Sequence, residues 1–173
     1  MSRDHDDTGG SRRRWQDASM ATIKDQLQSD LSTAMKARDD LRSGTIRMVL
    51  AAITTEEVSG KEARELTDDD VITVLGREAK KRREAAEAYD DAGRSELADK
   101  ERSELAVIEG YLPEQMSDDE LNAIVDAAVA EVAGSGAEGG KAMGAVMKIV
   151  QPKVKGRADG SVVAARVKAA LGM

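Results

Sequence analysis

Apolar residues recur every three or four positions through almost the whole chain, which is the spacing of amphipathic helices. Before Pro113 there are four such stripes, which begin at Ile23, Leu41, Val71 and Leu97. Three shorter stripes come after it, which begin at Leu121, Met143 and Val163. No run of residues alternates between apolar and polar as a strand would. The pattern therefore predicts an all-α protein.

Polar residues mark where several of these helices begin. Thr22–Asp25 and Ser117–Glu120 have the spacing of a capping box, in which two side chains bond the free N–H groups of the first turn. Thr67 precedes three aspartates, and their charge suits the positive end of a helix dipole. We expect Ser95 to cap the fourth helix.

Prolines and glycines mark where the helices end. Pro113 ends the fourth helix, and we expect Pro152 to close the sixth. The segment Gly134–Gly140 is a flexible break, and either Asp159 or Ser161 caps the last helix.

The stretch YLPEQMS, residues 111–117, combines a proline with a new helix cap and so predicts a domain boundary. We expect a four-helix bundle over residues 20–113 and a small three-helix domain over residues 114–173. Residues 1–19 are polar and charged and contain glycine and serine, which predicts a disordered extension.

The residue types restrict the chemistry. The chain has no cysteine, and its one histidine, His5, lies in the extension. Most clustered carboxylates stand at helix starts, where capping explains them. We therefore expect no catalytic residue, no metal site and no cofactor. No apolar run approaches the ~20 residues that cross a bilayer, so we expect no membrane partner and a cytoplasmic protein.

Charge is distributed unevenly. The net charge is −7, yet from Gly139 onward seven Lys and Arg residues face one acid, Asp159, a net +6 that leaves −13 for the rest. A positive segment in an acidic protein is a candidate anion-binding surface.

The densest positive charge is in QPKVKGRADG, residues 151–160. Lys153, Lys155 and Arg157 lie on one side if this segment is extended, with Lys148 and Lys141 in support. We take these five as the candidate RNA-binding residues, against the alternative of a solvated loop between helices.

A second basic cluster, Arg77, Lys80 and Lys81, lies on the third helix. Glu78 and Glu84 stand within pairing distance on the same helix, which favours a solvated, ion-paired face there. We keep it as a secondary basic face.

Aromatic residues are too few to grip single-stranded RNA by stacking. Beyond residue 19 the chain has two tyrosines and no other aromatic residue, and both tyrosines lie on helix stripes. An RNA partner would therefore be held by its phosphates and its shape, as a structured RNA is.

Several segments resemble those of the GatB/YqeY family. They are AMKARDDLRSGTIRMVLAAI (34–53), AGRSELADKE (92–101), YLPEQMSDDEL (111–121) and MGAVMKIVQPKVKGRADGSVV (143–163). The resemblance implies an all-helical, two-part fold, related to the C-terminal tail domain of the aminoacyl-tRNA amidotransferase B subunit.

The resemblance also implies a function. That amidotransferase is a carbon–nitrogen ligase that uses glutamine as amide donor, and its tail domain contacts tRNA while other parts supply the chemistry. We expect a tRNA-binding accessory protein that is not catalytic alone. The implied partners are tRNA or another structured RNA, amidotransferase subunits, and an aminoacyl-tRNA synthetase. The alternative is a protein–protein interaction adaptor with no RNA role.

Overall fold

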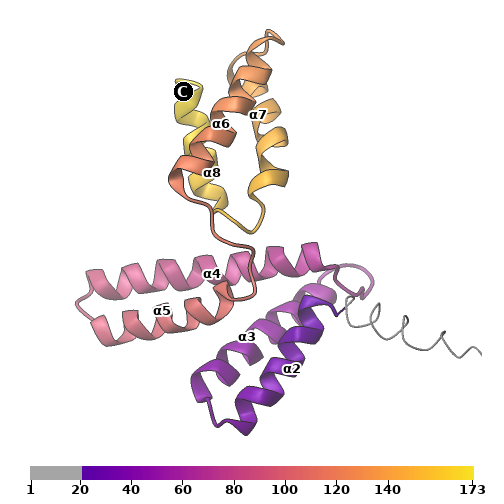
Figure 1. The fold of residues 1–173 in the computed structure, drawn as a ribbon, viewed down its shortest axis with the longest axis vertical. Coiled ribbons are helices and arrows are strands. Elements are labelled where there is room, and N and C mark those ends of the chain that lie inside the picture. Colours follow the sequence, from indigo (N-terminus) through magenta and orange to yellow (C-terminus); the bar gives the residue numbers. More distant parts are fainter. Residues whose placement is uncertain (1–20) are drawn as a thin grey trace, which may run out of the picture.

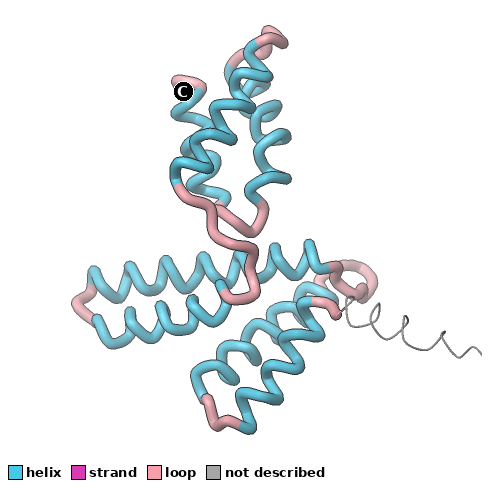
Figure 2. The backbone as a smooth tube through the Cα atoms, in the orientation of Figure 1, coloured by secondary structure: helices cyan, strands magenta, loops and turns pink. Residues whose placement is uncertain are grey.

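The computed structural model describes residues 21–173 and confirms the all-α prediction. Within that range there are seven helices and no strand (Figures 1 and 2). The helices are α2 (Ile23–Lys36), α3 (Asp40–Glu57), α4 (Asp68–Asp91), α5 (Ser95–Glu109), α6 (Asp118–Ala133), α7 (Gly139–Val154) and α8 (Gly160–Ala170). The expected disordered extension, with His5, lies outside the described residues.

The capping signals are confirmed at three helix starts. Thr22 and Asp25 form a reciprocal capping box at α2, and Ser117 and Glu120 form another at α6. At α4 the partner of Thr67 is Asp70, which also accepts a hydrogen bond from Arg64 at 2.9 Å. The Arg64 hydrogen bond, with those from Thr67, holds the pKa of Asp70 well below its usual range.

Two expected boundaries are wrong. The N-cap of α5 is Arg94, and Ser95 is already the first helical residue. Helix α7 runs past Pro152, because that proline removes one N–H while Val150 and Val154 remain buried against the neighbouring helices. Of the two candidate caps for α8, Asp159 is the one whose side chain accepts from the Ser161 N–H, at 2.8 Å.

The first four helices form two hairpins, α2–α3 and α4–α5, that lie across each other (Figure 1). Their contact is a cluster of aliphatic side chains. Its buried members are Leu27, Ile46, Val49, Ile53, Leu66, Val71, Val74, Leu75, Ala79 and Ile108. Burying one such side chain contributes roughly 1.5–3 kcal/mol, so this cluster holds the two hairpins together.

The last three helices stand on the middle of α4 and have a cluster of their own (Figure 1). Its buried members are Leu121, Val125, Ala128, Val132, Ala142, Val146, Val150, Val154, Val163 and Val167. The two clusters share no residue. We propose that they are the cores of two domains, divided at residues 114–117.

A hydrogen-bond network anchors the end of α5 to α2. The Tyr111 hydroxyl donates to Asp30 Oδ2, and Arg42 Nη2 lies 3.3 Å from the same oxygen. Burial of the hydroxyl and its bond to Asp30 raise the pKa of Tyr111 to about 12, from 10.0. The network fixes the chain just before it leaves the first domain.

This network gives a pH-dependent prediction. Between pH 10 and about 12 the folded protein keeps the Tyr111 proton that the unfolded chain loses. The contribution of Tyr111 is therefore complete below pH 10 and is lost as pH rises through 12. We expect urea denaturation to show Tyr111→Phe less stable than wild type at pH 8, with the gap shrinking by pH 11.5. A stability difference that stays constant with pH, or one that shrinks equally for Tyr89→Phe, would contradict the raised pKa of Tyr111.

Candidate nucleic-acid interface

The basic turn between α7 and α8 is the joint between the two halves of the structure. The Met116 N–H donates to the Arg157 carbonyl at 2.7 Å, and the Gln115 amide donates to the Gly156 carbonyl at 3.0 Å. Gly156 has φ +72° and lies so close to α4 that a Cβ there would stand 2.5 Å from Ile72 Cγ2. The turn marked by Pro152 and Gly156 therefore contacts both α4 and the linker between the two halves.

The Arg157 side chain bonds to residues on the other side of this joint. Its Nε donates to the Glu114 carbonyl at 3.0 Å, and its Nη2 lies 3.6 Å from Glu120 Oε2. The extended conformation considered for residues 153–157 is wrong, because Lys153 is in the last turn of α7. Lys153, Lys155 and Arg157 consequently do not share one side, although Lys153 and Lys155 are both exposed.

Helix α7 instead aligns three of the five candidates. Lys155 directly follows α7 as its C-cap, and its N–H still bonds to the Gln151 carbonyl. The seven-residue spacing therefore places Lys141, Lys148 and Lys155 on one side, at intervals of about 10 Å. All three are exposed, and none forms an ion pair within residues 21–173. We call these three residues the α7 lysine row. The seven-residue spacing is visible in the sequence, but it is informative only if the helix continues through Pro152.

The basic residues of the second domain are balanced in number by its acids. Over residues 114–173 there are eight acids against seven bases, because the acids of α6 belong to the same three-helix unit. Two of the seven bases pair with α6: Arg157 with Glu120, and Arg166 with Asp118 at 3.0 Å. The α7 lysine row is left without such compensation.

The secondary basic face is paired with carboxylates. Arg77 Nη2 lies 2.9 Å from Glu56 on α3, and Lys81 Nζ lies 2.7 Å from Glu78. Lys80 is held more loosely, with two carboxylate oxygens at 3.9 Å, one from Glu84 and one from Asp159. This arrangement is the ion-paired helix face that the spacing favours.

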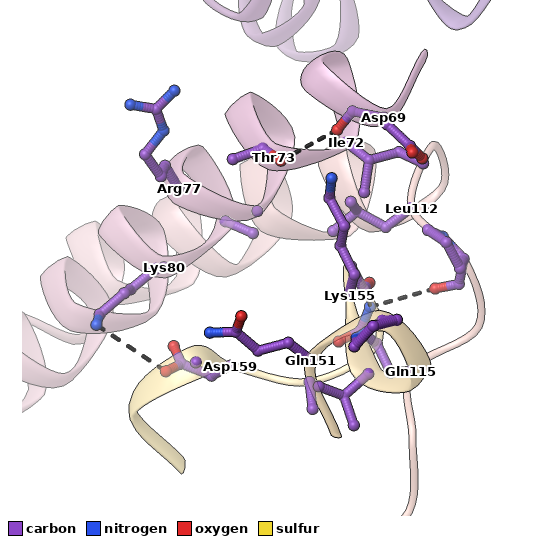
Figure 3. Close-up of a pocket in the computed structure, with 18 of the residues that line it drawn as sticks. Asp69, Ile72, Thr73, Arg77, Lys80, Leu112, Gln115, Gln151, Lys155 and Asp159 are labelled. Carbon is purple, nitrogen blue, oxygen red and sulfur yellow. Dashed lines mark hydrogen bonds and ion pairs between the residues drawn. The ribbon is translucent and has the colours of Figure 1, made fainter. Parts of the chain in front are cut away.

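A cleft of about 970 Å³ lies beside the contact between α4 and the α7–α8 turn, and it is lined by parts of both basic clusters (Figure 3). Lys155 reaches across from the turn toward α4, while Lys80 reaches from α4 to Asp159. Arg77 also lines the cleft, but its guanidinium is directed to Glu56.

Three uncharged polar residues of the cleft were not identified from the sequence. Thr73 lies on α4, Gln115 in the linker and Gln151 on α7. Each is unremarkable within its own segment, and only the docking of the second domain on α4 brings them together.

Other site types find no support in the described part of the chain. Residues 21–173 contain no group of three or more His, Asp or Glu side chains placed to hold a metal ion. Over the same residues, no helix combines the length and the apolar character needed to cross a bilayer.

Several relatives of this chain carry mitochondrial names. "Altered inheritance of mitochondria protein 41, mitochondrial" of Pyrenophora tritici-repentis is 28% identical over 151 residues, which cover 85% of this chain and 80% of the relative. Proteins of the same name from Vanderwaltozyma polyspora and Lachancea thermotolerans are 37% and 36% identical, over 50% of this chain and 46% of each relative. The chain thus aligns with about half the length of these yeast relatives.

These names contradict the cytoplasmic location predicted from the sequence. That prediction used the absence of cysteine and of a membrane-spanning run. Neither feature distinguishes one aqueous compartment from another, so neither separates the two locations.

The chain matches one protein family over nearly all of the described structure. The family described as "Yqey-like protein" matches residues 24–171, from the first turn of α2 to the residue after α8. The match includes both hydrophobic clusters, the α7 lysine row and the joint. The chain belongs to the Yqey-like protein family.

Proposed function

We propose that this protein binds tRNA or another structured RNA, and that the α7 lysine row contacts the phosphates. The observation that carries the proposal is the alignment of Lys141, Lys148 and Lys155 on one side of α7 without acidic partners. Phosphate contacts supply most of the affinity of proteins for nucleic acids and need no aromatic side chains.

The remaining surface supports an oriented mode of binding. The acids of α6 and the net negative charge of the first domain disfavour RNA over most of the surface, which favours contact at the α7 lysine row. Of the other candidates, Lys153 is exposed in the last turn of α7, and Arg157 acts by shaping the joint. In a glutamine-dependent tRNA amidotransferase system, the protein would contribute RNA recognition, with the carbon–nitrogen ligase chemistry supplied by other subunits.

Removing the three positive charges of the α7 lysine row tests the proposal. We expect wild type to bind a tRNA transcript with log K falling against log[salt] at a slope of roughly −2 to −3, as three neutralised phosphates require. The triple variant Lys141→Gln, Lys148→Gln, Lys155→Gln should lose most of this affinity and most of the slope. Fluorescence anisotropy at several salt concentrations measures both quantities.

A matched variant separates position from total charge. Lys36→Gln, Lys61→Gln, Lys100→Gln also removes three exposed lysines, all from outside the second domain. It should keep the affinity and slope of the wild type. Equal losses in the two triple variants, or no RNA binding by the wild type, would contradict the proposed function.

A further inference from the structure

The cleft between α4 and the α7–α8 turn has the features of a binding site for a chain of nucleotides. Two of its lysines come from different domains: Lys80 from α4 and Lys155 from the end of α7. Four cations line it, but Arg77 and Arg83 are paired with Glu56 and Glu109 outside the lining. The attraction for an anion therefore comes from one lysine on each wall, Lys80 and Lys155.

The two lysines that line the cleft are available to a ligand. Lys155 has no ion-pair partner within residues 21–173 and extends into the cleft (Figure 3). Lys80 has only two contacts with carboxylates, both at 3.9 Å, near the limit for an ion pair. A phosphate that approached either ammonium at hydrogen-bond distance would make a shorter, charge-assisted contact.

Between the lysines the cleft is apolar, with amide groups at its edge. Ile72, Leu112 and Pro113 form part of the apolar surface, and Gln115 and Gln151 supply the amides. The Gln151 amide can both donate and accept hydrogen bonds, as base edges require, whereas Gln115 already donates to the Pro113 and Gly156 carbonyls and offers its oxygen as an acceptor. An A-form duplex stacks the faces of its bases inside the helix and presents phosphates, 2′-hydroxyls and base edges, so it cannot place a base face on this apolar surface.

We propose that the cleft receives an unpaired segment of the bound RNA, with phosphates at Lys80 and Lys155 and bases against the apolar surface. Lys155 is also the last member of the α7 lysine row, so a strand that follows Lys141 and Lys148 is led directly into the cleft. This inference rests on the proposed RNA-binding function and adds to it a preference for RNA with an unpaired end. It also makes α4 part of the RNA-binding surface.

The first test compares two RNAs of the same hairpin, one blunt and one with an unpaired 3′ overhang. Wild type should bind the overhang form more tightly. Lys80→Gln should weaken binding of the overhang form about two- to fivefold and leave the blunt form unchanged. Lys148→Gln should weaken both forms alike, and Lys100→Gln, on α5, should weaken neither.

The second test uses the absence of cysteine from the chain. Thr73→Cys places a single thiol on the α4 wall of the cleft, and Ser95→Cys places one at the start of α5, outside the cleft. The overhang RNA should slow alkylation of the thiol at position 73 severalfold and leave that at position 95 unchanged. The blunt RNA should slow neither.

The outcomes separate this inference from the function on which it rests. If both RNAs bind equally, and Lys80→Gln and the thiol at position 73 do not respond, the cleft proposal is overturned while RNA binding by the α7 lysine row stands. If neither RNA binds wild type, both proposals are overturned. A preference for the overhang RNA that Lys80→Gln abolishes supports the cleft.

Discussion

Replacing Arg82 with alanine should destabilise the first domain by about 3–5 kcal/mol, the largest effect we expect from one side chain. Arg82 lies on α4 with 8% of its surface exposed, between two carboxylates that are buried to the same extent, Glu78 and Glu104. Its Nη1 is 2.7 Å from Glu78 Oε2, and its Nε is 3.5 Å from Glu104 Oε2 on α5. Without the guanidinium, Glu104 loses its cationic partner, and Glu78 keeps only the exposed Lys81, whose Nζ lies 2.7 Å from its Oε1.

The size of this effect follows from burial. A carboxylate transferred from water into a protein interior loses its hydration, and only a neighbouring positive charge or hydrogen bonds offset that loss. Since folded domains are stable by only about 5–15 kcal/mol, the variant should unfold at a much lower urea concentration. Equilibrium denaturation followed by circular dichroism measures the change in midpoint.

The adjacent residue gives a matched control. Arg83 is on the same helix and pairs with Glu109 of α5 at 3.2 Å, but about a third of each side chain is exposed. Arg83→Ala should cost at most about 1 kcal/mol, because solvent screens exposed pairs. If Arg82→Ala costs no more than Arg83→Ala, the buried cluster does not stabilise the fold as argued.

A second variant identifies the cause of the loss. Adding Glu78→Gln and Glu104→Gln to Arg82→Ala removes both buried charges and keeps the side-chain volumes close to the original. This triple variant should be more stable than Arg82→Ala alone. A triple variant that is still less stable would show that lost packing of the arginine stem, including its contact with Met48, dominates.

Local signals were enough to predict most of the helices. Capping boxes at Thr22 and Ser117 fixed the starts of α2 and α6, because they depend only on side chains within one turn of the helix. The boundary at Pro152 was wrong because tertiary packing overrode the local preference. Helix α5 begins one residue earlier than predicted, at an N-cap that makes no side-chain hydrogen bond. Val154, just past Pro152, is buried in the second cluster, and this packing extends α7.

The candidate site was predicted less well than the fold, since it depends on how the domains meet. Counting charge from Gly139 onward separated the basic residues from the α6 acids that lie in the same unit. The role of Arg157 in the joint depends on Glu114 and Met116, about forty residues earlier in the chain. No short-range pattern contains that information.

Replacing Gly156 with alanine should displace the second domain from α4. Gly156 combines φ +72°, which costs a residue with a side chain about 1–2 kcal/mol, with a close approach to two rigid neighbours. The new Cβ would lie 2.5 Å from Ile72 Cγ2 and 3.3 Å from Pro113 Cδ, so the turn and α4 must move apart. Because the turn also holds the linker through the Gly156 and Arg157 carbonyls, the joint should loosen as a whole.

Spin labels at Ser95→Cys and Glu131→Cys, on α5 and α6, measure this displacement in an otherwise cysteine-free chain. Gly156→Ala should shift or broaden the distance distribution between the labels. Gly136→Ala is the control. Gly136 has φ +70° but no atom within 4 Å of the added Cβ, so this variant introduces the backbone strain without a steric clash. Ile72→Ala removes the clashing Cγ2 and should restore much of the original distribution in the Gly156→Ala background. If Gly156→Ala and Gly136→Ala give the same distribution as wild type, the contact at Ile72 does not position the domains, and the cleft beside it has no fixed width.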